Sequence, residues 1–160
     1  MSRGYLRFAL VSLLAIWLLS GCGTKSHSLL VIENSKYDMA GTIDKFSKLF
    51  AKKGYLKVDV IDNTAIAKRE NIYLRPLKAL VINNDKISSA LMTCNASLAI
   101  EMPIRISIYE ELGGNVKYSY TQPEYWSLKH NIKDKNCISV VLQIARDFDE
   151  ISSQIAKSTK

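Results

Sequence analysis

Histidine and cysteine are the side chains of this chain best suited to chemistry, and there are few of them. The 160 residues include two His and three Cys. His130 lies in a polar stretch beside Lys129 and could act as a general acid or base, because imidazole titrates near neutral pH. No Asp or Glu lies at an obvious orienting distance in sequence, so the alternative is an exposed loop histidine. The other histidine, His27, is remote, and the sequence predicts neither a metal site nor a cofactor.

A small-ligand pocket is the second candidate site. Its expected lining combines two guanidinium groups, a phenol and an imidazole, from Arg75, Arg105, Tyr120 and His130. The alternative for Tyr120 and for Tyr118 is packing in the core or along an edge strand. The sequence has no Gly-x-Ser-x-Gly motif and no phosphate-binding glycine loop, so it indicates no nucleophile of those kinds.

The elements that must position these residues follow from hydrophobic periodicity. Three- and four-residue spacing after a capping Asp38, and again near the C-terminus, predicts helices. Alternation of apolar and polar residues predicts half-buried strands. The expected elements are a strand at 28–33, a helix at 39–53, strands at 56–60 and 77–82, a short helix at 85–94, a hairpin at 104–109 and 116–120, and a long helix at 138–155. Residues 62–75 are expected to be irregular, with room for one turn of helix at 65–67, and residues 121–136 to form a polar connection.

This β-α-β-β-α-β-β-α order predicts one α+β domain over residues 28–160. A mostly antiparallel sheet of about five strands, with helices on one face, would bury all the apolar stripes. The most distinctive helix is the long one at the C-terminus. The length of the chain supports one such domain and leaves little room for a second.

The N-terminus has the pattern of a targeting segment. Residues 1–7 carry two positive charges and no acid, and Phe8 to Leu19 form an apolar run interrupted by Ser12. A basic region followed by an apolar run of this length is typical of a secretory signal peptide. The alternative, a membrane-spanning helix, needs about 20 apolar residues and is therefore disfavoured.

The end of this segment, Leu19-Ser20-Gly21-Cys22, resembles the bacterial lipobox. That resemblance implies removal of residues 1–21 and attachment of acyl chains such as palmitate to Cys22, with residues 22–27 as a short tether. Two or more acyl chains hold a protein stably on a membrane. We therefore expect an exported lipoprotein in the cell envelope, on the periplasmic face of the inner or outer membrane in a Gram-negative cell.

Loss of residues 1–21 lowers the formal charge from +7 to +5, because 20 basic and 15 acidic residues remain. An exported protein meets no chromosome, so we expect no nucleic-acid partner. The other two cysteines, Cys94 and Cys137, allow a single disulfide, which could persist outside the cytoplasm. The alternative is that both are small core residues.

Residues 38–132 resemble a bacterial family called domain of unknown function 302. The matching features are, in order, Gly54-Tyr55, Ile61-Asp62, Leu74-Arg75-Pro76, Ala90-Leu91-Met92, Ile100 to Arg105, Tyr109-Glu110, Gly114-Asn115-Val116, Tyr120 to Pro123 and Lys129 to Ile132. The resemblance implies a helix-grip, TBP-like fold with a long C-terminal helix across a curved sheet. It implies no activity. The chain departs from the family pattern at Asn63, where many members have histidine, and at residues 82–85.

Three functions remain open from the sequence. The first is a membrane-tethered accessory domain that binds a small apolar or amphipathic ligand, or an envelope protein, between the sheet and the long helix. The second is an envelope enzyme that uses His130 with Arg75 or Arg105. The third is a structural or stress-related lipoprotein that acts through a protein partner. A homodimer is compatible with all three.

Overall fold

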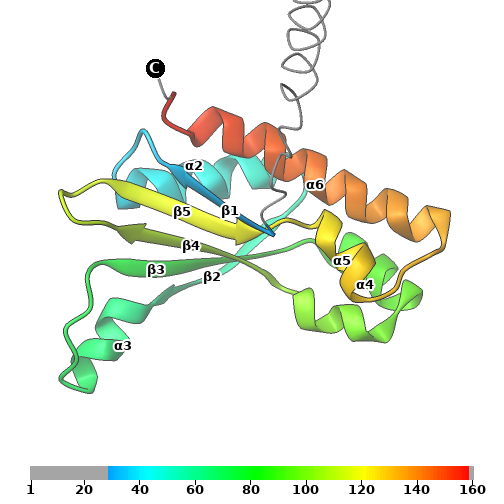
Figure 1. Cartoon of the computed structure of the whole chain (residues 1–160), viewed down its shortest axis with the longest axis horizontal. Coiled ribbons are helices and arrows are strands. Elements are labelled where there is room, and N and C mark those ends of the chain that lie inside the picture. Colours follow the sequence, from blue (N-terminus) through cyan, green and yellow to red (C-terminus); the bar gives the residue numbers. More distant parts are fainter. Residues whose placement is uncertain (1–28, 159–160) are drawn as a thin grey trace, which may run out of the picture.

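The computed structural model describes residues 29–158, which form an α+β domain around one five-stranded antiparallel sheet (Figure 1). The strand order is β1-β5-β4-β3-β2, so β1 and β2 are the two edges. The strands are β1 (Leu30–Asn34), β2 (Leu56–Asp62), β3 (Leu77–Asn83), β4 (Ile104–Glu110) and β5 (Val116–Thr121). The fold class predicted from the sequence is therefore confirmed.

Two long helices cover one face of this sheet, as Figure 1 shows. They are α2 (Met39–Lys52) and α6 (Lys135–Ile155). The carboxylate of Asp38 caps α2 by accepting from the Gly41 N–H. Gly54, at a φ of 82°, follows the end of α2, in the left-handed region that favours glycine. Asp134 caps α6 by accepting from the N–H groups of Asn136 and Cys137.

The hydrophobic core lies between the sheet and these two helices. On β4 and β5 every second residue is buried, and these side chains face the aromatic stripe of α2 and the apolar stripe of α6. Aromatic rings meet at its centre, where Phe46 and Tyr118 pack edge to face with centroids 4.9 Å apart. The largest fully buried side chains are Trp126, Tyr55, Tyr118, Phe46, Phe50 and Phe148. Tyr118 is thus a core residue, the alternative expected for it.

The remaining elements lie at the two ends of the sheet. Between β3 and β4 come α4 (Asp85–Cys94) and the 3-10 helix η1 (Ala96–Glu101), and α5 (Glu124–Lys129) precedes α6. At the opposite end, α3 (Asn63–Arg69) stands away from the body on the connection between β2 and β3 (Figure 1). The β4–β5 hairpin turns there through Gly113 and Gly114, both at positive φ.

Three local expectations need correction. The single helical turn expected at residues 65–67 is part of a longer helix, α3, whose first turn is capped by the Asp62 side chain. Residues 121–136 contain α5, which has no side-chain cap and was too short to show periodicity. The first half of β2 is not half-buried: Leu56 and Val58 are 65% and 58% exposed, and only Val60 of the predicted alternation packs against the core. β2 is an edge strand, and the pairing shifts by one residue between Lys57 and Asp59, so its alternation does not match the core face.

The predicted signal peptide (residues 1–21), the lipidation site Cys22 and the tether (residues 22–27) lie outside the described residues. Within residues 29–158, no helix has the length and apolar character needed to cross a membrane.

Candidate functional site

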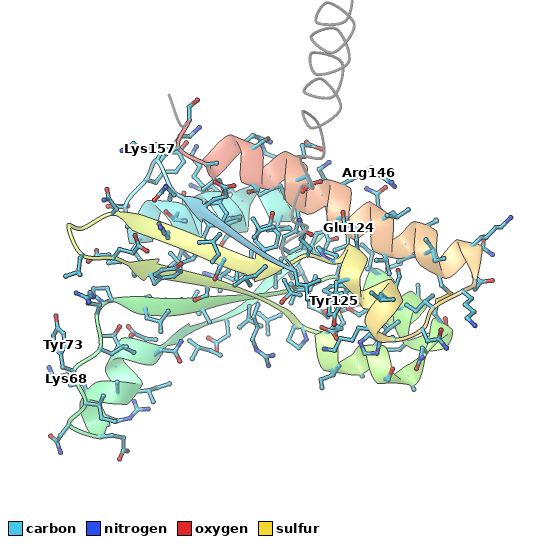
Figure 2. The ribbon with its side chains drawn as sticks, in the orientation of Figure 1. Lys68, Tyr73, Glu124, Tyr125, Arg146 and Lys157 are labelled. Atoms are coloured by element: carbon cyan, nitrogen blue, oxygen red, sulfur yellow. A yellow bond between two sulfur atoms is a disulfide. The ribbon has the colours of Figure 1, made fainter. Side chains whose placement is uncertain are left out.

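A cleft of about 550 Å³ separates the edge of the sheet from the C-terminal half of α6. We call it the helix–sheet cleft. β1 and β5 form one wall, and α6 with the residues after it forms the other. Figure 2 shows Lys157 just beyond the end of α6, at one end of this region. The lining residues are Val31, Glu33, Tyr120, Gln122, Asp149, Ser152, Ser153, Ala156, Lys157 and Ser158.

The floor of the helix–sheet cleft is fixed by hydrogen bonds between the sheet and α6. The Tyr118 hydroxyl donates to the Ser152 carbonyl (3.1 Å) and lies 2.7 Å from Ser152 Oγ. Tyr120 stacks beside Tyr118 with ring centroids 6.4 Å apart. Burial raises the pKa of Tyr120 to about 12, and the negative charge of Asp149 acts in the same direction. At neutral pH the cleft therefore presents a protonated phenol.

The rim of the cleft carries both signs of charge, with acids in excess. Glu33 on β1 and Asp149 on α6 face it, against one cation, Lys157. Serine hydroxyls from Ser152 and Ser153 lie between them. Most of the lining groups are donors and acceptors of hydrogen bonds, which favours a polar ligand over a purely apolar one. The cleft can hold a small molecule that offers hydroxyl groups and a positive charge.

A second polar cluster surrounds His130 at the end of α5. Its Nδ1 lies 2.6 Å from the Ser97 hydroxyl, and its Nε2 lies 2.7 Å from Glu101 Oε1. Lys129 donates to the same Glu101 oxygen at 2.8 Å. Asn95 donates to the His130 carbonyl at 3.0 Å. The cluster ties η1 to α5, two elements about 30 residues apart in sequence.

This environment corrects the expectation of an exposed loop histidine: His130 is 9% exposed. Burial alone would raise the pKa of Glu101, but hydrogen bonds from Lys129 and His130 outweigh it and the pKa is lowered. A carboxylate at Nε2 favours the tautomer with the proton on Nε2, and Nδ1 then accepts from the Ser97 hydroxyl. Sequence reasoning missed Ser97 and Glu101. No local pattern in the sequence indicates that they meet His130.

A small cavity of about 130 Å³ adjoins this cluster. Glu101, Arg105 and Trp126 are among its lining residues. The indole N–H of Trp126 is buried and has no hydrogen-bond partner among the described residues. The cavity is therefore lined by a carboxylate, a guanidinium and an indole side chain, in a space suited to a few atoms only.

The four residues expected to line one pocket lie in three places. Arg105 and His130 both adjoin Glu101, from the small cavity and the polar cluster respectively. Tyr120 lines the helix–sheet cleft instead. Arg75 precedes the other end of β3, because Val81 pairs with Arg105 whereas Leu77 pairs with Tyr109. Six residues of extended chain place Arg75 roughly 20 Å from Val81, so it belongs to neither site.

Cys94 and Cys137 form a disulfide in the structure, with a Cα–Cα distance of 5.9 Å. Cys94 is the last residue of α4 and Cys137 lies in the first turn of α6. The bridge therefore holds the α4–η1 segment, which carries Ser97 and Glu101, against the long helix. Among residues 29–158, no group of three or more His, Cys, Asp or Glu side chains is arranged to hold a metal ion.

Comparison with known proteins identifies relatives of this domain. The family model "Domain of unknown function DUF302" matches residues 31–155. A solved structure described as an uncharacterized conserved protein DUF302 from Bacillus stearothermophilus superposes with a TM-score of 0.71 at 14% identity, over 79% of this chain and 98% of that one. This similarity shows the fold.

Two curated sequences share a more distant similarity. Fluoride-specific ion channel FluC 1 of Brucella suis biovar 1 (strain 1330) is 23% identical over 103 residues, which are 64% of this chain and 41% of that protein. FluC 1 of Brucella abortus biovar 1 (strain 9-941) is also 23% identical over 103 residues, 38% of its length. The chain thus spans about two fifths of the length of these relatives.

Proposed function

We propose that this chain, which belongs to the DUF302 family, is a lipid-anchored envelope protein whose domain binds a small polar ligand in the helix–sheet cleft. The ligand class is a hydroxylated amine. The observation that carries the proposal is the lining of the cleft, which combines two carboxylates, a protonated phenol and serine hydroxyls in a volume of about 550 Å³. Ligand sites usually measure about 300–1,000 Å³.

The anchor is supported by the sequence before the domain. A basic segment, a twelve-residue apolar run and the sequence Leu19-Ser20-Gly21-Cys22 precede the first strand. Acyl chains on Cys22 would keep the domain at a membrane surface. A tether this short would hold the binding domain close to that surface.

The charges of the cleft support a cationic group on the ligand. Asp149 and Glu33 stand on opposite walls, and an ammonium group between them would be attracted by both carboxylates. The hydroxyls of Ser152, Ser153 and Tyr120 can each donate or accept a hydrogen bond to a ligand hydroxyl. Ser152 Oγ lies 2.7 Å from the Tyr118 hydroxyl and Ser153 Oγ donates to the Glu150 carbonyl at 2.8 Å, so a ligand would meet their remaining lone pairs. An apolar ligand would displace water from the two carboxylates without replacing it, which costs free energy.

Calorimetric titration with glucosamine tests the proposed chemistry, because this molecule has one amine and several hydroxyl groups. Glucose, which lacks the amine, is the comparison ligand. We expect Asp149→Asn to weaken glucosamine binding by about 10- to 150-fold, since one charged hydrogen bond contributes about 1.5–3 kcal/mol. Asp44→Asn makes the same change on α2, where Asp44 pairs with Lys48 at the surface. Equal binding of both sugars, or equal loss in both variants, would contradict the proposal.

A second candidate function is acyl transfer at Ser97. The specific observation that favours it is the hydrogen-bonded series Ser97–His130–Glu101, in which the imidazole could take the serine proton while the carboxylate stabilises the imidazolium. It ranks second because Ser97 lines neither the helix–sheet cleft nor the small cavity, so neither would hold a substrate against it. Labelling of the wild-type chain, but not of Ser97→Ala, by a fluorophosphonate probe would support it.

A further inference from the structure

The chain enters the domain at one defined end of the sheet. Leu30, the first residue of β1, pairs with Thr121, the last residue of β5. The Leu29 carbonyl accepts from the Gln122 N–H. In Figure 1 the beginning of β1 and the helix α5 therefore lie together, at the end of the sheet opposite the β4–β5 hairpin. Any segment that precedes residue 29 reaches the domain at this end.

Large apolar side chains are exposed at this same end. Leu29 and Leu30 are 50% and 44% exposed, Ile100 of η1 is 70% exposed, and Leu128 of α5 is 78% exposed. We call these four residues the tether-end surface. Exposed apolar side chains that cluster in this way mark an interaction site more often than an isolated one does.

Printed contacts link the members of the tether-end surface. Ile100 and Thr121 line the same small cavity, and Thr121 pairs with Leu30. Glu101 follows Ile100 and forms an ion pair with Lys129, the neighbour of Leu128. The four apolar side chains thus come from three elements that meet beside the polar cluster of His130.

Cations accompany these apolar groups. Arg105, which lines the small cavity together with Ile100, is exposed, and Lys129 keeps 44% of its side-chain surface exposed while it pairs with Glu101. The acids of this region are Glu101, which that pair neutralises, and the exposed Glu124. Apolar side chains with basic neighbours suit the boundary between the headgroups and acyl chains of an anionic bilayer.

We propose that the tether-end surface lies on the membrane, with Ile100 and Leu128 at the headgroup boundary. The inference rests on the proposed lipidation of Cys22. Seven residues, 22–28, reach at most about 25 Å, so the lipid keeps the end of the domain that contains Leu29 near the bilayer. We call α3 and the residues that follow it up to β3 (63–76) the α3 arm. The β4–β5 hairpin and the α3 arm then point away from the membrane.

Photo-crosslinking of the full lipidated chain tests this orientation. The chain is expressed with benzoylphenylalanine at position 128 or 100, and reconstituted in vesicles of phosphatidylethanolamine and phosphatidylglycerol. The matched control is position 112, because Leu112 is 79% exposed, as Leu128 is, but lies in the β4–β5 hairpin. Tyr73, 88% exposed on the α3 arm (Figure 2), is a second control.

We expect about fivefold more lipid adduct at positions 128 and 100 than at positions 112 and 73, because only the former pair would rest in the interface. Equal yields at all four positions in an anchored chain would overturn the proposed orientation. An unacylated chain, or a Cys22→Ala chain that stays as firmly in the membrane fraction as the wild type, would instead overturn the lipid anchor itself. The two failures are therefore distinguishable.

Discussion

Replacement of both Cys94 and Cys137 by alanine should lower the free energy of unfolding by about 4 kcal/mol. The two residues are 43 positions apart. A cross-link that closes a loop of this length restricts the unfolded chain by about 13 cal/mol/K on the chain-entropy relation, which gives about 4 kcal/mol at 25 °C. Because a domain of this size loses about 3–4 °C per kcal/mol, the midpoint of thermal unfolding should fall by about 15 °C.

Urea denaturation of the oxidised wild-type chain, the reduced wild-type chain and the double alanine variant measures this difference. The double variant should match the reduced wild type, because both lack the cross-link. Its m-value should exceed that of the oxidised chain, since an uncrosslinked unfolded state exposes more surface. A free energy of unfolding for the double variant within 1 kcal/mol of that of the oxidised chain, about a quarter of the expected loss, would refute this expectation. Free thiols at both positions in the wild-type chain isolated without reductant would refute it as well.

Three further substitutions test individual contacts by urea denaturation. Glu101→Gln should lower the free energy of unfolding by about 2 kcal/mol at pH 7. Because the pKa of Glu101 is lowered in the folded state, this stabilisation is present above the pKa of the unfolded state and is lost as the pH falls through the pKa of the folded state. A difference from wild type that persists at acid pH would contradict the role assigned to the ion pairs. Tyr55→Phe removes a donor to the buried Asp147 (3.2 Å) and should cost about 1–2 kcal/mol; an unchanged midpoint would show that the bond contributes nothing. Tyr118→Phe, which removes the link to Ser152, should cost about 1 kcal/mol with an unchanged m-value, and a larger m-value would indicate a different cause.

The fold followed from the sequence wherever an apolar pattern was long enough to repeat. The stripe of α6 runs over 21 residues, and that of α2 over 14, so both helices and the face that they bury were predictable. β4 and β5 alternate cleanly because one face is core and the other is not. α5 has six residues and no side-chain cap, which leaves no periodic signal to read.

The sites were less predictable, because they depend on contacts between distant segments. Glu101 and His130 are 29 residues apart, and no pattern in the sequence around either residue predicts that η1 and α5 are in contact. The role of Tyr120 could be expected only in part. The alternation along β5 predicts that its side chain is buried, but not that it lines the helix–sheet cleft. Ser152 offered one usable signal, a polar residue within the buried stripe of α6, where it bonds to Tyr118.

Native mass spectrometry of the full chain, purified from its own membranes in detergent, tests the central proposal most directly. We expect a polypeptide that begins at Cys22, carries covalently bound acyl chains and retains a small polar molecule by non-covalent contacts. The Asp149→Asn chain should carry the same acyl chains and lose the small molecule. A wild-type chain that still begins at Met1 without acyl chains, and that holds no small molecule, would contradict both the anchor and the binding function.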